Sequence, residues 1–182
     1  MTAVQPFRQY RTLGFSRILH WPPVGLSEVT LGRGYDMGNR SAGEIYATLR
    51  QAELEEYKAS LCARAAGLKG KRAGEFVKVY GPLVGEITHQ QQIGLFEIAY
   101  SEKLAYTKSV YGRVSRRIPD APSWQSFDQR IKDVLVDIFF QGVENTAALF
   151  SAAIKGKQAL IIHIQSSTTY MSYEMNRLRH LK

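Results

Sequence analysis

The stretch SEVTLGRGYDMGNRS, residues 27–41, decides the fold of this chain, and its glycines lie at positions 32, 34 and 38. A dinucleotide-binding loop has the pattern G-x-G-x-x-G between a strand and a helix, and here the last gap is one residue too long. A phosphate-binding P-loop needs Gly-Lys-Ser/Thr, which the stretch lacks. Because glycine permits positive φ and close backbone approach, the stretch predicts a tight hairpin.

Such a hairpin can hold the hydroxyl of Thr30 and the carboxylate of Asp36 facing one cleft. A hydroxyl and a carboxylate together can position a water and support an oxocarbenium-like centre in sugar chemistry. The alternative is an ordinary hairpin, in which Asp36 caps the chain near Ser41 and has no chemical role. Spacing alone leaves both interpretations open.

The composition is that of a folded domain with a positive charge. The chain has 182 residues, 45% of them hydrophobic, and a net charge of +8. The charge favours a polyanionic partner, which could be nucleic acid, an anionic membrane or an acidic cell-wall polymer. The single cysteine, Cys62, excludes a disulfide within the chain and is typical of a buried, inert thiol. No apolar run approaches the length of a membrane span.

Helical signals dominate after residue 40. Ser41 with Glu44, and Thr88 with Gln91, each form the pattern of a capping box at the start of a helix. The second box opens a long helix with an apolar stripe of Ile93, Phe96, Tyr100 and Leu104. The other helices are expected over 42–67, in two pieces, over 71–80 with a stop at Gly81-Pro82, over 126–142 with an end at Gly142, and over 145–155, 157–165 and 169–181.

Several segments together resemble a known family. The stretch VTLGRGYDMG, residues 29–38, resembles the T-[IL]-G-x-G-[YF]-D-[LM]-G segment of the pesticin-type lysozyme domains. These are relatives of phage lysozyme that occur in bacteriocins and in type VI secretion effectors. The segments LHWP (19–22), THQQQIGLFEIAY (88–100) and LVDIFFQG (135–142) also resemble parts of these domains, in the same order.

The resemblance implies a muramidase, which cuts the β-1,4 bond between N-acetylmuramic acid and N-acetylglucosamine. In such domains a glutamic acid, a threonine and an aspartate carry the chemistry. Thr30 matches the threonine that helps to place the attacking water, and Asp36 matches the aspartate six residues later. The general acid is expected upstream of the threonine, near the end of an N-terminal helix.

The chain departs from the family at this acid, because residues 1–27 contain neither Asp nor Glu. Gln5 and Gln9 occupy the expected window, and a glutamine cannot deliver a proton to a leaving oxygen. Three explanations stay open. Position 5 or 9 carries a Glu→Gln change that disarms the domain; the protein is a natural pseudoenzyme; or another carboxylate is the acid, namely Glu28, Glu44 or Glu97.

Other residues are candidates for substrate binding, each with a structural alternative. His20 could hydrogen-bond across the cleft, and Trp21 and Tyr35 could stack on sugar rings, unless they serve packing. Gln141 could present a cleft-facing amide at the end of its helix. Arg177 matches the place where phage lysozymes have an arginine near the catalytic acid, although an exposed basic helix face is the default interpretation. No metal-ligand spacing is visible among the histidines, and we expect no metal and no cofactor.

We therefore predict an α+β, mostly helical fold. It is lysozyme-like, a single domain over 1–182 with a small hairpin lobe at 1–40 and a helical lobe at 41–182, and it could be cut from a longer effector. The function predicted is a peptidoglycan hydrolase; the alternatives are a non-catalytic lysozyme-like module that binds glycan or protein and, less favoured, a basic nucleic-acid binder.

The expected partners are a peptidoglycan strand, an immunity protein and components of a secretion machine. We expect neither nucleic-acid binding nor membrane insertion. Arg8, Arg11 and Arg17 interrupt any signal-peptide pattern. The resemblance accordingly implies secretion without a cleavable signal and action in the periplasm of target bacteria.

Overall fold

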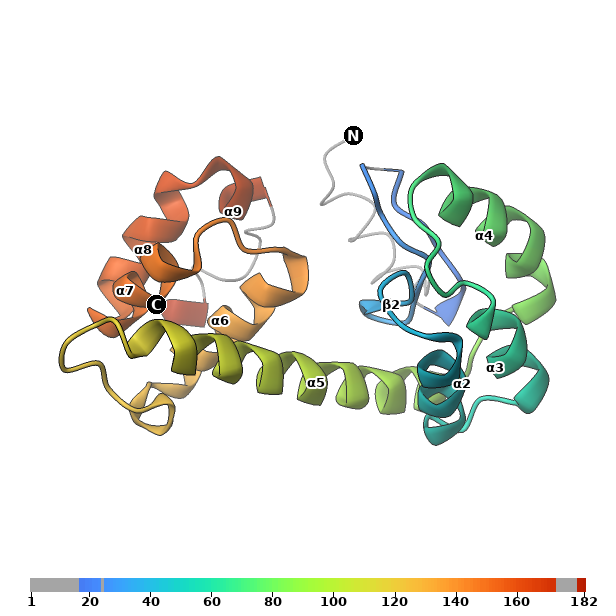
Figure 1. Ribbon diagram of the computed structural model, residues 1–182, viewed down its shortest axis with the longest axis horizontal. Helices are drawn as coiled ribbons and strands as arrows, with labels where there is room; N and C mark the ends of the chain where they lie inside the picture. Colours follow the sequence, from blue (N-terminus) through green and yellow to red (C-terminus); the bar gives the residue numbers. More distant parts are fainter. Residues whose placement is uncertain (1–16, 24, 173–179) are drawn as a thin grey trace. The chain divides into compact units, whose positions relative to one another are not determined.

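The computed structural model describes residues 17–23, 25–172 and 180–182 (Figure 1). In this part of the chain the fold is mostly helical with one small antiparallel hairpin, as the sequence predicts. The backbone forms two compact units, 1–100 and 101–182. The division between the two units falls inside a long helix.

The described part of the first unit contains the hairpin and the helices that follow it. Their bounds are β1 Thr30–Leu31, β2 Tyr35–Asp36, α2 Ala42–Gln51, α3 Glu56–Ala63 and α4 Lys71–Val84. Helix α2 packs against α3, and α3 packs against α4. Helix α2 begins with the predicted capping box: Glu44 N–H donates to the Ser41 hydroxyl, and Ser41 N–H donates to the Glu44 carboxylate.

The predicted stop of α4 at Gly81-Pro82 is wrong, because the helix includes Pro82 and runs on to Val84. A proline inside a helix removes the bond to the carbonyl four residues earlier, here that of Lys78. Both Lys78 and Pro82 are exposed, so water can solvate that carbonyl. The helix ends where Gly85, at φ +66°, donates its N–H to the carbonyl of Gly81.

The long helix α5 spans His89–Ser115 and begins with the second predicted capping box, between Thr88 and Gln91. The side chain of Gln91 also donates to the carbonyl of Glu53, which ties the start of α5 to the turn between α2 and α3. The predicted apolar stripe is wrong by one position. Ile93 is exposed and Phe96, Tyr100 and Leu104 are half-buried, whereas the buried face carries Gln92, Leu95 and Ala99.

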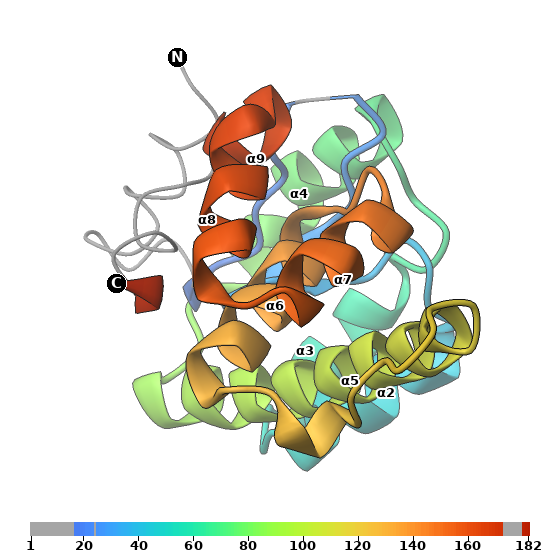
Figure 2. The same ribbon diagram turned by 90° about the vertical axis from the view of Figure 1, so that its left-hand side faces the viewer.

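The second unit contains the remainder of α5 and a group of shorter elements. Their bounds are η2 Trp124–Ser126, α6 Gln129–Gln141, α7 Thr146–Ile154, α8 Lys157–Ser166 and α9 Thr168–Ser172. Figure 2 views the molecule from the side of this unit, and it shows α7, α8 and α9 following one another, coloured from orange to red. Helix α8 packs against both α7 and α9. Helix α6 ends at Gly142 as predicted.

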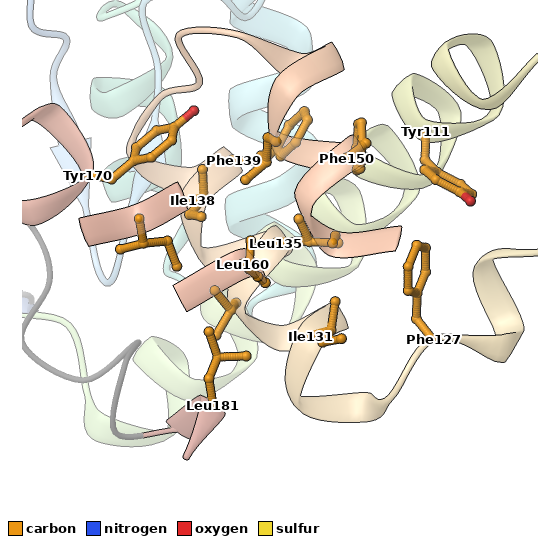
Figure 3. Close-up of a cluster of buried hydrophobic side chains, with 14 of the residues drawn as sticks. Tyr111, Phe127, Ile131, Leu135, Ile138, Phe139, Phe150, Leu160, Tyr170 and Leu181 are labelled. Atoms are coloured by element: carbon orange, nitrogen blue, oxygen red, sulfur yellow. The ribbon is translucent and has the colours of Figure 1, made fainter. Parts of the chain in front are cut away.

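An aromatic and aliphatic cluster forms the core of the second unit (Figure 3). Side chains of α6, among them Leu135 and Ile138, converge on Phe150 of α7 and Leu160 of α8. Tyr111 packs edge-to-face on Phe150 at 5.1 Å between ring centroids. Burial of this surface is the main source of stability for such a unit, at about 25 cal/mol per Å² of apolar area.

Two negative expectations from the sequence concern Cys62 and the membrane. Cys62 of α3 is fully buried, and this burial raises the pKa of its thiol to about 12, which is typical of an inert cysteine. Among the described residues, no helix is both long enough and apolar enough to cross a bilayer.

Candidate functional site

The glycine-rich stretch forms the predicted hairpin. Strands β1 and β2 pair antiparallel, with Thr30 opposite Asp36 and Leu31 opposite Tyr35. The connecting residues include Gly32 at φ +62° and Gly34 at φ +90°. Side chains other than glycine rarely adopt these angles, so the two glycines are what allow a turn this short.

Thr30 and Asp36 are in direct contact across the hairpin. The Thr30 hydroxyl donates to a carboxylate oxygen of Asp36 at 2.6 Å, and the backbone carbonyl of Glu28 lies 3.3 Å from the same hydroxyl. Thr30 is buried, whereas Asp36 is exposed. The pair predicted from sequence is therefore brought together, with a carboxylate that solvent and a ligand can reach.

Tyr35 is a core residue of the hairpin. Its side chain is fully buried, and the guanidinium of Arg40 lies 4.3 Å from the centre of its ring. Arg40 also donates from Nε to the backbone carbonyl of Asp36 at 2.8 Å. Tyr35 consequently offers no exposed ring for stacking on a sugar. Arg40, which the sequence analysis missed, braces the end of β2 beside the candidate carboxylate.

His20 forms a backbone pair with Thr30 that the sequence did not predict. Each residue donates its N–H to the other's carbonyl at 2.9 Å. The imidazole Nδ1 lies 3.0 Å from the carbonyl of Ile18, to which it donates. Burial lowers the pKa of His20, and the hydrogen bond to Ile18 opposes this shift more weakly.

Glu28 closes the base of the hairpin. Its carboxylate accepts from the N–H of Gly38 at 2.8 Å and from the side-chain amide of Asn39, and it lies 3.7 Å from the ammonium of Lys69. A Cβ on Gly38 would lie 2.6 Å from the Glu28 Cγ, so only glycine leaves room for the carboxylate. One oxygen of Glu28 accepts from a backbone N–H and the other from a side-chain amide of the same segment, which favours a structural role over that of general acid.

The other carboxylates considered as the acid have different settings. Glu44 belongs to the capping box of α2, and hydrogen bonds first from the backbone and then from the side chain of Ser41 lower its pKa. A lowered pKa is the opposite of what a general acid needs at neutral pH. Glu97 is exposed on α5. Gln5 and Gln9 lie outside the described residues, so the position of the missing acid stays a prediction.

Trp21 packs onto helix α4. A Cβ on Gly74 would lie 2.6 Å from the indole Cε3, so glycine at this place in α4 lets the ring approach the helix. The ring is half-buried, and its Nε1 has no hydrogen-bond partner in the part of the chain that the structure describes. Trp21 therefore has the packing role that was one of its two predicted roles. Its contact with a sugar stays a prediction.

Two further candidates, Gln141 and Arg177, belong to the C-terminal half of the sequence. Gln141 is the half-buried last residue of α6 in the second unit, and Arg177 lies outside the described residues. Two residues that contact Glu28 at the base of the hairpin were not predicted. Asn39 directly follows Gly38 in the sequence and could have been found from this position. Lys69 could not, because its partner Glu28 is forty-one residues away.

Within residues 17–23, 25–172 and 180–182, no cluster of His, Cys, Asp and Glu is suited to hold a metal ion.

Comparison with known families gives a match that covers most of the chain. A family model described as "Domain of unknown function (DUF8812)" matches residues 8–160, which is most of the chain and includes the whole hairpin. No curated protein matches the sequence.

Proposed function

The chain belongs to the DUF8812 family, whose function is unknown, and we propose that it is a peptidoglycan hydrolase, an N-acetylmuramidase with a lysozyme-like fold. One observation carries the proposal: the hydrogen bond of 2.6 Å between the Thr30 hydroxyl and the exposed Asp36 carboxylate. The resemblance to pesticin-type lysozyme domains implies these two residue types at this spacing on a glycine-shaped hairpin.

In this proposal Asp36 is the base and Thr30 positions it. The threonine hydroxyl donates its proton to Asp36 and so fixes the orientation of the carboxylate. Asp36 takes a proton from a water whose oxygen bonds to the anomeric carbon of muramic acid. The bond from that carbon to the glycosidic oxygen breaks, and a general acid must protonate the leaving oxygen.

The acid is the element that the hairpin does not supply. Glu28 and Glu44 are engaged in holding the hairpin and the start of α2. We therefore place the acid upstream, at the position of Gln5 or Gln9, where a glutamine leaves the domain able to bind glycan but without a proton donor. The chain is accordingly a muramidase inactivated at its general acid.

A second candidate function is a non-catalytic module that binds glycan or protein. The observation that favours it is the engagement of Glu28 in backbone and side-chain hydrogen bonds, together with the absence of Asp and Glu before residue 28. In that case the Thr30–Asp36 pair would bind sugar hydroxyls and would not activate water.

The biological setting follows from the resemblance. We propose that the protein acts on peptidoglycan in the periplasm of target bacteria, is delivered by a secretion machine that needs no cleavable signal, and is neutralised by an immunity protein in the producing cell. Its net charge of +8 supports attraction to an acidic cell wall. Expression of a glutamate-restored protein with and without an added periplasmic signal tests this setting, since only the exported form should lyse the host.

The decisive experiment is digestion of purified peptidoglycan. The protein, its Gln5→Glu and Gln9→Glu variants and the control Gln125→Glu in the second unit are each incubated with peptidoglycan, and the released fragments are analysed by mass spectrometry. Fragments with a reducing muramic acid end from a glutamate-restored variant, but not from the control, support the proposal.

The binding module is tested with the same proteins. If no variant releases fragments but the protein sediments with insoluble peptidoglycan, and Asp36→Ala weakens this binding, the second function holds. If the protein neither cuts nor binds peptidoglycan, both candidate functions are excluded.

A further inference from the structure

Three arginines gather at the end of helix α5. Arg113 belongs to the last turn of the helix, and Arg116 and Arg117 directly follow its last residue, Ser115. The N–H of Arg117 donates to the carbonyl of Val114 at 3.0 Å, so the chain keeps a helical winding beyond Ser115. Residues three and four positions apart on such a winding are neighbours. Arg116 and Arg117 therefore lie beside Arg113.

The three guanidinium groups are exposed and unpaired. In the part of the chain that the structure describes, none of these side chains has a hydrogen bond or an ion pair to another residue, and Asp120, the nearest acid in the sequence, forms none with them. Other acids of the second unit have partners of their own. Asp128 lies 3.7 Å from Lys157, and Asp133 contacts His180. The protein itself therefore leaves the charge of the three arginines uncompensated.

Stabilisation of the helix end does not account for a cluster of this size. A cation near the C-terminus of a helix interacts favourably with the partial negative charge there, which explains one arginine. However, the carbonyls of Val114 and Ser115 already accept from the backbone N–H groups of Arg117 and Ile118. Like charges three and four positions apart also repel one another and destabilise a helix. A bound anion would remove this repulsion.

The chemistry of the cluster selects the kind of anion. The planar guanidinium group donates two parallel hydrogen bonds to a carboxylate or a phosphate. A helix that binds a membrane surface also buries an apolar face in the lipid. Here the apolar side chains of the segment, Val110, Tyr111 and Val114, pack into the core of the second unit. A polymer that repeats an anionic group suits the cluster better, because many weak contacts then act together.

Building on the proposed hydrolase, we propose that Arg113, Arg116 and Arg117 form an anchoring site for the carboxylates of the stem peptides in peptidoglycan. Each guanidinium group pairs with a carboxylate, and the repetition of stem peptides along the glycan strand supplies further carboxylates within reach. The site belongs to the second unit, whereas the Thr30–Asp36 pair belongs to the first. It therefore holds the polymer and takes no part in the cleavage of the glycosidic bond.

The test measures binding of the unaltered protein to insoluble peptidoglycan that is free of phosphate-containing polymers. The test variant replaces all three arginines by glutamine. The control variant loses the same charge by replacing three exposed cations of α4 with glutamine, namely Lys71, Arg72 and Lys78. We expect the dissociation constant from sedimentation to rise about tenfold in the test variant and less than about twofold in the control.

Two results of this assay would overturn the anchoring site. Equal weakening in both variants would show that net charge alone attracts the protein to the wall. Unchanged binding in the test variant, together with a lower unfolding temperature, would show that the arginines serve only the end of α5.

A second set of ligands identifies the anion. Peptidoglycan whose carboxylates have been converted to amides should bind the unaltered protein about tenfold more weakly and should no longer distinguish it from the test variant. Undiminished binding to the amidated polymer overturns the assignment to carboxylates. The proposal is also wrong if the test variant binds peptidoglycan normally but loses binding to vesicles of anionic phospholipid or to DNA.

The result for the anchoring site is separate from that for the proposed hydrolase. Fragment release by a glutamate-restored protein, with unchanged peptidoglycan binding in the arginine variant, would overturn the anchoring site and leave the hydrolase intact. Weakened binding in the arginine variant, with no fragments from any glutamate-restored protein, would overturn the hydrolase and leave the anchoring site.

Discussion

The hairpin of the first unit and the aromatic core of the second unit are held in different ways. The strands of the hairpin are only two residues long. Beside the buried side chains of Leu31 and Tyr35 they have specific polar contacts, among them the Glu28 carboxylate on Gly38 and the Thr30–Asp36 pair. The second unit buries a large apolar cluster around Phe150 and Leu135. Substitution of Thr30 or Asp36 in the hairpin should therefore change the catalytic rate with little effect on the free energy of unfolding. Substitutions in the core of the second unit should lower the free energy of unfolding.

The largest effect is expected for Asp36→Asn in an active, glutamate-restored protein. Loss of the base should reduce the rate of fragment release about 10²- to 10⁴-fold. Because Asp36 is exposed, the unfolding temperature should stay close to that of the parent. The matched control is Asp120→Asn, at an exposed residue with φ +55° that asparagine tolerates. Full activity in Asp36→Asn would remove this residue from the mechanism.

Phe150→Ala tests the other side of the comparison. The ring is fully buried among Tyr111 and Phe139, so its removal should lower the free energy of unfolding by about 3–5 kcal/mol. Chemical denaturation measures the change. The control Ile162→Ala, at an exposed residue of α8, should alter stability by less than about 0.5 kcal/mol. Equal effects of the two variants would contradict the packing described for this core.

Gly38→Ala should disturb the hairpin without touching the reacting groups. Its Cβ would lie 2.6 Å from the Glu28 Cγ and 2.8 Å from the backbone carbonyl of Leu68, and such overpacking costs about 1–3 kcal/mol. Gly43→Ala in α2 is the control: its Cβ meets no atom closer than 4.0 Å, and it should stabilise the helix by about 0.5–1 kcal/mol. Stabilisation by Gly38→Ala would show that Glu28 does not close the hairpin as described.

The smallest effect concerns the start of α2 and depends on pH. The folded-state pKa of Glu44 lies below its unfolded value, because Ser41 hydrogen-bonds to the carboxylate. Its contribution is therefore present above the unfolded pKa and is lost as the pH falls through the folded one. The unfolding temperature of Glu44→Ala should lie slightly below that of the parent at neutral pH, and the difference should shrink on acidification. If the difference in unfolding temperature did not change with pH, the effect of Glu44→Ala would come from helix propensity and not from the charge of the carboxylate.

The local features of the fold could be predicted from sequence. Both capping boxes, at Ser41 and Thr88, are where the sequence places them, because a cap depends on residues three positions apart. The end of α6 at Gly142 is confirmed as well, because a glycine can adopt the positive φ, here +114°, that ends the helix. The stop before Pro82 failed because the cost of a proline depends on whether solvent reaches the freed carbonyl, and sequence does not give that exposure.

The features that depend on distant residues could not be predicted. The buried face of α5 carries Leu95 and not Ile93, because packing in the folded unit and not apolar periodicity selects the face. The contact between Thr30 and Asp36 could be predicted from the sequence, since both residues lie in one short hairpin. The pairing of His20 with Thr30 and the contact of Glu28 with Lys69 could not, since they close longer loops that no local pattern marks.

The most direct test of the central claim, that Thr30 and Asp36 act as one unit in hydrolysis, is a double-mutant cycle in the glutamate-restored protein. Rates of release of reducing muramic acid ends are measured for the parent, Thr30→Val, Asp36→Asn and the double variant. Because residues that act as a unit are strongly non-additive, the double variant should be about as slow as the slower single variant. Additive losses, or fragment release unchanged by either substitution, would contradict the claim.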